Sequence, residues 1–511
     1  MKYTIKEDTD LRKRIKQFSN AELLKMVVCP NYNEKNISEI VDTYCLFIHP
    51  TTLDKAQEIM KQIKNKINHP VLIASDMEAG PGTAIVGATR FPSMRALKEA
   101  EDEILTYLTG KIAAREALDA GYNWTFGPCV DILGNHFSPI TSIRSASENY
   151  QEVIKYTTEY AKGIQDNNMV ATAKHFPGDG NCLFDQHLTT AINPLTKKEW
   201  DESYRKVYQA LIDMGIKSIM PGHIALPAYD EIDETLGLYP PATLSYNLLT
   251  TLLKEDLGFN GLIISDATEM TGFCGYVNYY EACARFLVSG GDCLLFTHPT
   301  DEYITKMSEF IESGYLTRDI LEDRAYRVLA FVEDNCHSGI KQPYLKEAHQ
   351  HVSDEIVEKS IKVFRDRKNL LPIKKQNLRI AHVVIAKQIE NQIIEDFTKQ
   401  LKRYGQVTEL IDPGCNKLKE IAKSKGYDLI ICTIGCSQWY GTNQITLSGT
   451  IARNMMNGWM KYDTPVVFVD FGNPYLHEEY NACIDTLIYT YGYANKTIDV
   501  VTSKIFNCCD K

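Results

Sequence analysis

The stretch MVATAKHFPGDGNCLFDQHL, residues 169–188, joins a strand pattern to a segment crowded with ionisable side chains. Residues 169–173 form a short apolar run, which predicts a strand buried in a sheet. Lys174 and His175 follow that run directly, so the strand fixes where their backbone lies. The proline and the two glycines after them exclude regular structure and let the chain turn sharply. The stretch therefore predicts a strand whose carboxyl end carries chemistry.

The same arrangement recurs along the first two-thirds of the chain. Short apolar runs alternate with helical patterns, one of which repeats apolar residues from Ile104 to Ile112 and stops at Gly121. The runs predict strands at residues 71–74, 124–130, 169–173, 216–220, 262–264 and 293–296. Five of them lead into titratable groups, which are Asp76, Asp131, Lys174 with His175, His223 and Asp266.

Strands that alternate with helices indicate βαβ units and a parallel sheet. In a (β/α)₈ barrel all the carboxyl ends of the strands lie on one face, where the active sites of such enzymes assemble. A doubly wound open sheet would also bind ligands beyond its carboxyl ends. The length of the pattern favours the barrel, so we predict an α/β protein with a TIM-like barrel over residues 1–335.

A polar segment separates this pattern from a second, smaller one. Residues 336–353 carry Gly and Pro without a clear period and are predicted to be a linker, with His349 and His351 as solvated members. Residues 354–511 predict an α/β domain with a helix at 354–365 and parallel strands at 380–386, 429–434, 466–470 and 487–491. Neither GxGxxG after its first strand nor GxxxxGKS/T is present, so nothing there indicates nucleotide binding.

The composition of the chain argues against several classes of partner. The chain has 511 residues, of which 44% are hydrophobic, and a formal net charge of −11 with acids and bases interspersed. Without a basic stripe, nucleic acid is not expected as a partner, and the acidity argues against an anionic membrane. No run approaches ~20 apolar residues, and the N-terminal residues lack a signal-like apolar region. We therefore expect a cytoplasmic protein whose 14 cysteines are mainly reduced thiols.

Asp266, in GLIISDATEM at residues 261–270, is the candidate nucleophile. Four apolar residues carry the chain into the interior, and the aspartate emerges at the end of the strand. A carboxylate held there by rigid backbone, beside walls of low dielectric constant, suits nucleophilic catalysis. Asp is also a favoured helix N-cap, and the local pattern alone supports both interpretations equally.

Asp185 and His187 form an Asp-x-His pair on the loop. The carboxylate can accept the imidazole N–H, which sets the tautomer and prepares the ring to exchange a proton near neutral pH. For the pair alone, a loop pinned by the same bond without catalysis is the simpler interpretation. The surroundings favour catalysis, because burying so many charges near one barrel face without a function would be costly. Those charges are Asp76, Lys174, His175, Asp185, His187 and Asp266.

A metal site is an alternative use for such a group of side chains. The sequence has no HExxH, no His-x-His leaves a predicted barrel strand, and Lys174 beside His175 would repel a cation. We therefore predict catalysis without a metal.

At these residues the chain resembles glycoside hydrolase family 3, in its β-N-acetylglucosaminidase branch. The matching segments are SDMEAGPG (75–82), NWTFGPCVDI (123–132), SIRSASENYQEV (142–153), KHFPGDG with DQH (174–187) and PATLSYNLLTTLLKEDLGFNGLIISDATEM (241–270). EKSIKVFRDRKNLLPIK (358–374) is similar to the start of that family's second domain. The likeness spans most of residues 1–375 in order.

The resemblance implies a (β/α)₈-like barrel followed by an α/β sandwich, and a retaining double displacement through a covalent glycosyl-enzyme. Asp266 would be the nucleophile, His187 the general acid/base and Asp185 its partner. The groups that would bind the sugar hydroxyls and N-acetyl group are Asp76, Arg144, Lys174 and His175, with Asp131 shaping the site. The implied substrates are short oligosaccharides such as cell-wall fragments or chitin oligosaccharides, and no metal or organic cofactor is implied.

The chain departs from common members of that family at two places. Ala79 and Gly80 follow Glu78 where a GG-Arg usually stands, and the loop reads GDG where many read GHG. GCSQWYGTNQ (435–444), in the second domain, could reach the site.

The same fold and site residues are compatible with other activities. An imidazole in place of the usual second carboxylate would repel an anionic acceptor less, so phosphorolysis is an alternative to hydrolysis. The D-x-H pair argues against a β-glucosidase or β-xylosidase. The complete catalytic set argues against a non-enzymatic sugar-binding protein.

Overall fold

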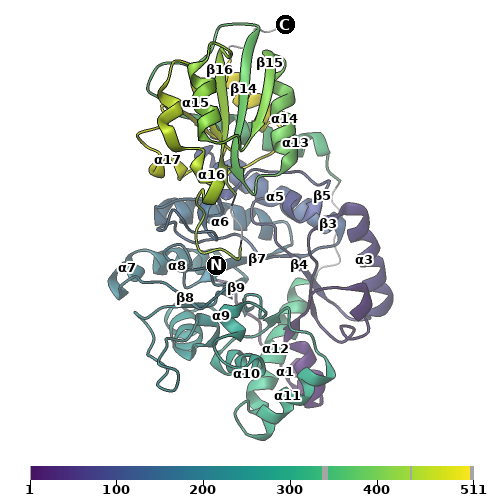
Figure 1. The fold of residues 1–511 in the computed structure, drawn as a ribbon. Coiled ribbons are helices and arrows are strands. Elements are labelled where there is room, and N and C mark those ends of the chain that lie inside the picture. The colour runs from purple at the N-terminus through teal and green to yellow at the C-terminus, as the bar shows by residue number, and fades with distance from the viewer. Residues whose placement is uncertain (1, 337–342, 438–439, 507–511) are drawn as a thin grey trace.

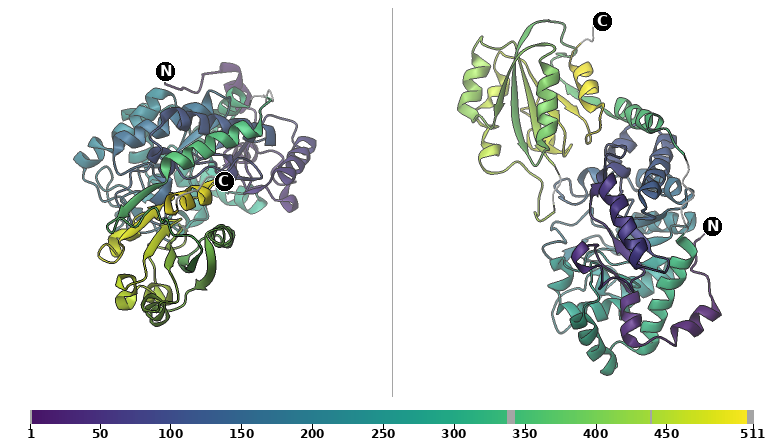
Figure 2. Two further views of the ribbon diagram at one scale, coloured as in Figure 1. Left: turned by 90° about the horizontal axis from the view of Figure 1, so that it is seen from above. Right: turned by 90° about the vertical axis from the view of Figure 1, so that its right-hand side faces the viewer.

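The computed structural model describes residues 2–336, 343–437 and 440–506. Figure 1 shows a barrel-like lower part, built from the first two-thirds of the chain, and a layered α/β part above it. The side view in Figure 2 shows the carboxyl-terminal part, coloured green to yellow, at one end of the barrel part. The chain passes from one part to the other between α12 (Arg318–Asn335) and α13 (Lys346–Ser360).

Eight parallel strands within the described residues close into a ring. Six of them pair in the order β11–β9–β7–β6–β4–β2, and β1 pairs with β12. Parallel bridges from Asn31 to Phe47 and from Ile264 to Cys293 join the two groups on both sides. The strands are β1 (Val28–Cys29), β2 (Cys45–Phe47), β4 (Leu72–Ser75), β6 (Trp124–Thr125), β7 (Val170–Phe176), β9 (Ser218–Pro221), β11 (Leu262–Ile263) and β12 (Leu294–Leu295). The predicted TIM-like barrel is therefore confirmed.

Helices surround the ring, and their apolar residues are mostly buried in the core that they share with the strands. In α5 (Glu103–Ala120), Asp102 caps the first turn and Gly121, with a φ of 101°, ends the helix as predicted. The others are α1 (Thr9–Ile15), α2 (Asn20–Met26), α3 (Leu53–Lys66), α4 (Met94–Glu99), α6 (Tyr150–Gln165), α7 (Lys197–Glu202), α8 (Tyr204–Met214), η5 (Asn247–Asp256), α9 (Thr271–Cys274), α10 (Tyr279–Ser289), α11 (Asp301–Glu312) and α12. Two short strand pairs lie outside the ring, β3 (Thr51–Thr52) with β5 (Ile85–Val86) and β8 (Ala191–Ile192) with β10 (Ile224–Ala225).

The second part contains a six-stranded sheet in the order β13–β18–β17–β16–β14–β15. The strands are β13 (Lys362–Asp366), β14 (Leu378–Lys387), β15 (Gly405–Ile411), β16 (Leu429–Cys436), β17 (Val466–Asp470) and β18 (Thr486–Tyr489). Along β16, Ile430 and Cys432 belong to one apolar cluster, whereas Leu429 and Ile431 belong to another. Both faces of the sheet are therefore covered. The covering helices include α14 (Asn391–Leu401), α15 (Cys415–Lys423) and α18 (Thr497–Ile505), with α16 (Gly449–Arg453) and α17 (Leu476–Glu479) in the connections.

The segment between the two sheets differs from its prediction. Helix α13 begins at Lys346, inside the stretch expected to be a linker, and β13 begins at Lys362, where the helix is expected to continue. Strand β13 pairs antiparallel with β18, so the sheet predicted to be parallel is mixed. Backbone hydrogen bonds to β18 satisfy residues 362–366 as an edge strand, and this pairing outweighs the local helical pattern. Part of the expected linker, residues 337–342, lies outside the described residues.

The two histidines expected to be solvated have different environments. His351 is exposed, as predicted. His349 is buried, and its Nδ1 hydrogen bonds Glu116 Oε1 at 2.7 Å. The prediction for His349 was wrong because α13 packs that side chain against α5, which the sequence alone does not reveal.

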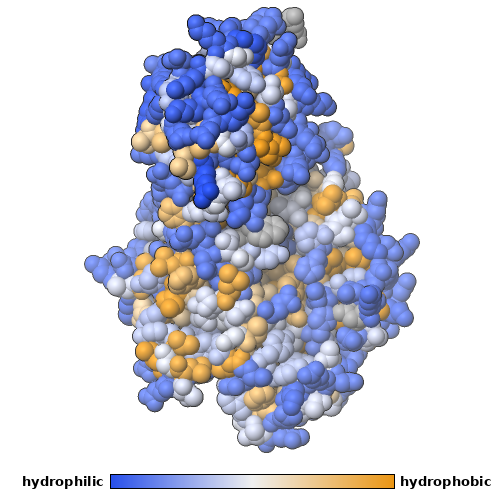
Figure 3. All heavy atoms as spheres, viewed as in Figure 1, coloured by the Kyte–Doolittle hydropathy of each residue, from blue (hydrophilic) through white to orange (hydrophobic). Residues whose placement is uncertain are grey.

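Hydrophilic side chains cover most of the face in Figure 3, with apolar ones in scattered patches. Among the described residues, no helix combines the length and apolarity needed to span a membrane. The cysteines of the described part are all free thiols, and the adjacent pair Cys508-Cys509 lies outside it.

Candidate active site

A cavity of about 730 Å³ lies at the carboxyl ends of the barrel strands. Its wall contains six residues singled out from the sequence, which are Asp76, Arg144, Lys174, His175, His187 and Asp266. Tyr440 and Tyr493, from the second part of the chain, also line it. Its size and its position on the barrel are those of an enzyme ligand site.

Asp266 lies three residues beyond the end of β11, at the carboxyl end of the strand as expected. Its backbone N–H donates to the Pro221 carbonyl at 3.1 Å, and the Ala267 N–H donates to its Oδ1 at 2.8 Å. Helix α9 begins only at Thr271, with Met270 at its N-cap, so Asp266 is not a helix cap.

The charge state of Asp266 suits a nucleophile. Burial raises the pKa of the carboxyl, but the surrounding imidazoles, led by His175, and the Lys174 ammonium lower it by more. The net pKa lies below the ordinary value, and the carboxylate is therefore ionised at neutral pH.

His187 and Asp185 form the predicted pair. His187 Nδ1–H donates to Asp185 Oδ1 at 2.6 Å, and the Asp185 side chain is fully buried whereas the His187 side chain is 30% exposed. Burial raises the pKa of Asp185, but the hydrogen bonds from His187 and Gly441 lower it by more, so it is an anion at neutral pH. Because Nδ1 is engaged, Nε2 is the nitrogen that can exchange a proton with a ligand in the cavity.

Two cations of the site share a partly buried carboxylate, that of Glu78. Lys174 Nζ lies 2.8 Å from Asp76 Oδ1 and 2.7 Å from Glu78 Oε1. Arg144 donates from Nε and Nη2 to the two oxygens of Glu78, each at 2.7 Å. Burial raises the pKa of Glu78, but Arg144 and Lys174 lower it far below its ordinary value. This bidentate network fixes the heads of Lys174 and Arg144 beside the cavity.

His175 is anchored from behind by Asp131. Its Nδ1 hydrogen bonds Asp131 Oδ2 at 2.8 Å, and Arg144 Nη2 lies 3.4 Å from its Nε2. Cys129, Asp131 and His175 bring one donor atom each to within 4.8 Å of one another. However, the Cys129 thiol also donates to Asp131, and the guanidinium adds positive charge beside the imidazole. The arrangement is therefore that of an oriented imidazole, and its donors do not fit a bound cation.

Glu78 and Tyr440 line the cavity, and Gln186 is buried within the acid/base loop, but none of the three was identified as a site residue from the sequence. Glu78 is two residues from Asp76, a spacing that in a continued strand places both side chains on one side and could have indicated it. Gln186, between the two members of the pair, donates from Nε2 to Asp179 Oδ2 at 3.0 Å and accepts the His223 N–H at 2.6 Å. Tyr440 lies in the segment 435–444, which was expected to be able to reach the site, and its position in the cavity wall confirms that expectation.

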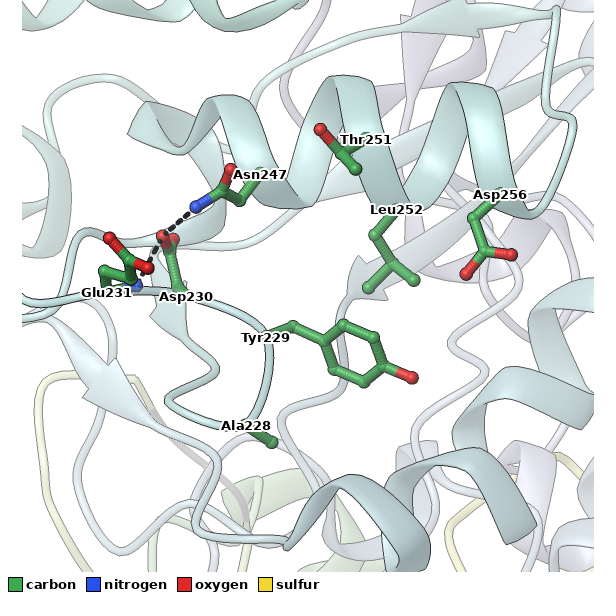
Figure 4. A pocket seen from close by; sticks show the side chains of 8 residues that line it. All are labelled: Ala228, Tyr229, Asp230, Glu231, Asn247, Thr251, Leu252 and Asp256. Atoms are coloured by element: carbon green, nitrogen blue, oxygen red, sulfur yellow. Dashed lines mark hydrogen bonds between the residues drawn. The ribbon is translucent and has the colours of Figure 1, made fainter.

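A second hollow, of about 530 Å³, lies between residues 228–231 and η5. Figure 4 shows Asp230 accepting hydrogen bonds from Asn247 and from the Glu231 backbone, with the Tyr229 ring beside them. It lies away from the titratable groups at the strand ends. The chemistry predicted from the sequence therefore belongs to the first cavity.

The profile named Glycosyl hydrolase family 3 N terminal domain matches residues 24–331. A Cellulomonas fimi protein named beta-N-acetylglucosaminidase/beta-glucosidase is 29% identical over 490 residues, which cover 90% of this chain and 86% of that protein. A beta-hexosaminidase of Haemophilus influenzae is 30% identical over 257 residues, 49% of this chain and 70% of that protein. A solved structure of beta-glucoside phosphorylase BglX superposes with a TM-score of 0.87 at 25% identity, covering 98% of this chain and 94% of that one. The resemblance found in the sequence is confirmed, and this chain belongs to glycosyl hydrolase family 3.

Proposed function

We propose that the protein is a retaining, exo-acting β-N-acetylglucosaminidase that releases terminal β-linked N-acetylhexosamine from short glycans. The observation that carries the proposal is that an ionised carboxylate, Asp266, and an Asp-supported imidazole, His187, line the same cavity. The names of the Cellulomonas and Haemophilus relatives support the choice of sugar. The expected natural substrates are cell-wall fragments or chitin oligosaccharides, and the cytoplasmic location stays a prediction.

The first half of the reaction forms a covalent glycosyl-enzyme. The Asp266 carboxylate attacks the anomeric carbon while protonated His187 gives its Nε2 proton to the departing glycosidic oxygen. Asp185, an anion bonded to Nδ1, stabilises the imidazolium and holds the ring in place. In the second half, neutral His187 takes a proton from water, and the water oxygen attacks the anomeric carbon and releases Asp266.

The remaining groups of the cavity bind the sugar. Asp76, whose side chain is 47% exposed, can accept hydrogen bonds from sugar hydroxyls, and the Lys174 ammonium beside it can donate to their oxygens. Arg144, fixed by Glu78, can offer further N–H groups to the sugar. His175, fixed by Asp131 at Nδ1, can offer its other ring nitrogen. We assign these four residues to the terminal sugar and its N-acetyl group.

Phosphorolysis is the second candidate function. The carboxylate of the pair is fully buried, so at the acid/base position an acceptor meets the imidazole and not an exposed carboxylate. A phosphate dianion would therefore be repelled less than at a carboxylate acid/base. The similarity to a solved beta-glucoside phosphorylase supports this candidate too.

The test uses 4-nitrophenyl β-glycosides of N-acetylglucosamine, glucose and xylose, each with and without inorganic phosphate. The proposal predicts fastest release of 4-nitrophenol from the N-acetylglucosaminide and free sugar as the product. A rate that rises with phosphate, with the sugar 1-phosphate seen by NMR, would assign phosphorolysis instead. A preference for the glucoside or the xyloside would contradict the assigned sugar.

A further inference from the structure

Asp185 is held by both parts of the chain. Within its own loop, its Oδ1 accepts the backbone N–H of His187 at 2.9 Å as well as the Nδ1–H. From the second part, the Gly441 N–H donates to Oδ2 at 2.6 Å, and Asn443 Oδ1 accepts the Asp185 backbone N–H at 3.1 Å. Thus Asp185 Oδ1 accepts from the imidazole, and Oδ2 accepts from the carboxyl-terminal part.

Tyr440 restrains the imidazole of the same pair. Its ring stacks on that of His187, with ring centroids 5.1 Å apart and planes 25° apart. The same tyrosine lines the cavity. The stack therefore restricts rotation of the ring that the Nδ1 hydrogen bond orients.

The segment 440–445 is itself fixed on the barrel. The N–H of Ile445, a buried residue, donates to the Phe137 carbonyl at 2.9 Å. Asn135, in the same barrel loop, donates from Nδ2 to the Cys182 carbonyl at 2.8 Å, three residues before Asp185. Gly441 has a φ of 84°, which a residue with a side chain rarely adopts. Three segments far apart in sequence therefore meet around the pair.

We propose that Tyr440, Gly441 and Asn443 position the acid/base pair, so that proton transfer by His187 depends on the second part of the chain. The inference rests on the proposed function and adds Gly441, Asn443 and Tyr440 as positioning residues. The physical reason is that a carboxylate held at both oxygens cannot rotate away from Nδ1, so Nε2 keeps its alignment with the leaving oxygen. A misplacement of about 1 Å at such a group can reduce the rate about 100-fold.

The test compares kcat/KM of full-length variants on two aryl β-N-acetylglucosaminides. Phenol is a poor leaving group that needs a proton, whereas 2,4-dinitrophenol leaves without one. Asn443→Ala should lower kcat/KM about tenfold on the phenyl glycoside and less than about twofold on the dinitrophenyl glycoside, as a partial loss of acid catalysis predicts. Thr442→Val is the matched control from the same segment, because the Thr442 hydroxyl bonds the Gln444 carbonyl and not the Asp185–His187 pair. It should match the wild type on both substrates.

A second pair of variants tests the inference independently in case Asn443→Ala does not fold. Tyr440→Ala should show the same leaving-group selectivity, and Tyr440→Phe, which keeps the ring, should not. Losses that are absent or equal on the two substrates, in both Asn443→Ala and Tyr440→Ala, would overturn the inference. A wild-type protein inactive on both glycosides would instead refute the proposed function.

Discussion

Asp266 shows how this site keeps a partly buried carboxylate ionised. Burial raises its pKa, and the imidazoles around it, together with Lys174, lower it below the ordinary value. Lys174 is protonated for a related reason, since burial lowers its pKa but Asp76 and then Glu78 raise it by more. The nucleophile is therefore ionised at neutral pH because three imidazoles, led by His175, and the Lys174 ammonium lie near it.

Replacing Lys174 by Met should raise the pKa of Asp266 toward its ordinary value, because a positive neighbour is lost. The ionised carboxylate is the active form, so activity on the acid side should be lost at a higher pH than in the wild type. The measurement is the pH dependence of kcat/KM from about pH 3 to pH 7. Lys174→Arg, which keeps the charge, is the control, and an acid limb that does not move in Lys174→Met would refute this explanation.

Replacing His187 by Ala removes the proton donor but leaves the nucleophile. We expect kcat/KM to fall about 100- to 1000-fold on phenyl β-N-acetylglucosaminide and less than about tenfold on the dinitrophenyl glycoside. The measurement is steady-state kinetics on the two substrates. Equal losses on both would argue against an acid role for His187.

At the scale of elements, strand β7 and the turn after it organise the site. The strand ends at Lys174, His175 and Phe176, and the turn then packs against the loop that follows β6. Asp131 in that loop holds the His175 imidazole and also accepts the Asp179 N–H at 2.6 Å. The turn is thus held in place by the residue that orients a sugar-binding imidazole.

Gly180 is required in this turn by close packing. A Cβ at this position would lie 1.7 Å from the Ile132 carbonyl oxygen, so Gly180→Ala must displace the turn or the neighbouring loop. We expect at least about a tenfold loss of kcat/KM, because the Asp185–His187 pair lies just beyond the turn. Kinetics together with a far-UV circular dichroism spectrum check this. Wild-type kinetics in Gly180→Ala would show that the turn tolerates the displacement.

The predictability of each element depended on its burial and length. Strands β4, β7 and β16 were found because their residues are buried on both faces and read as continuous apolar runs. Strand β15 was missed because it is a sheet edge with mostly partly exposed or exposed residues, among them Thr408 and Glu409. Strand β1 spans only Val28–Cys29, too short for a periodic signal. Its place in the ring depends on tertiary pairing.

At the scale of the whole molecule, ion pairs and hydrogen bonds join the two parts. Arg90, which lines the cavity, pairs with Glu390, and the Glu148 carboxylate on the barrel accepts from both Arg95 and Tyr475. On α5, Glu116 accepts from His349 of α13 and from the Thr89 N–H at 2.8 Å. The last network connects α13 to the loop that contains Arg90.

Replacing Glu116 by Gln should destabilise the protein by about 1–3 kcal/mol at neutral pH, because a buried acceptor of several hydrogen bonds loses its charge. Burial raises the pKa of Glu116, but His349 and Thr89 lower it by more. A lowered pKa stabilises the fold above the unfolded-state value, and this stability is lost as the pH falls through the folded-state value. Thermal melting should therefore separate the two proteins at pH 7 and bring them together in acid. Equal melting temperatures at pH 7 would contradict this role.

The sequence predicted the residues of the candidate site that lie at the ends of the barrel strands. Asp76, Lys174, His175 and Asp266 each follow a predicted strand, and parallel strands bring such groups to one face. The contact of Tyr440 with His187 could not be predicted, because it requires the second part to dock in one orientation on the barrel. A sequence pattern reports burial and periodicity within an element but not how two separate parts meet.

The central claim is that Asp266 forms a bond to the sugar while His187 handles the proton. The most direct measurement is mass spectrometry, of the intact protein and then of its peptic peptides, for His187→Ala mixed with 2,4-dinitrophenyl β-N-acetylglucosaminide. The good leaving group lets the first step proceed while the second lacks its base. We predict an adduct with the mass of one N-acetylglucosaminyl group on the peptide that contains Asp266, and no adduct when Asp266→Asn is added. An adduct on another residue, or dinitrophenol released by His187→Ala with Asp266→Asn as fast as by His187→Ala alone, would contradict the account.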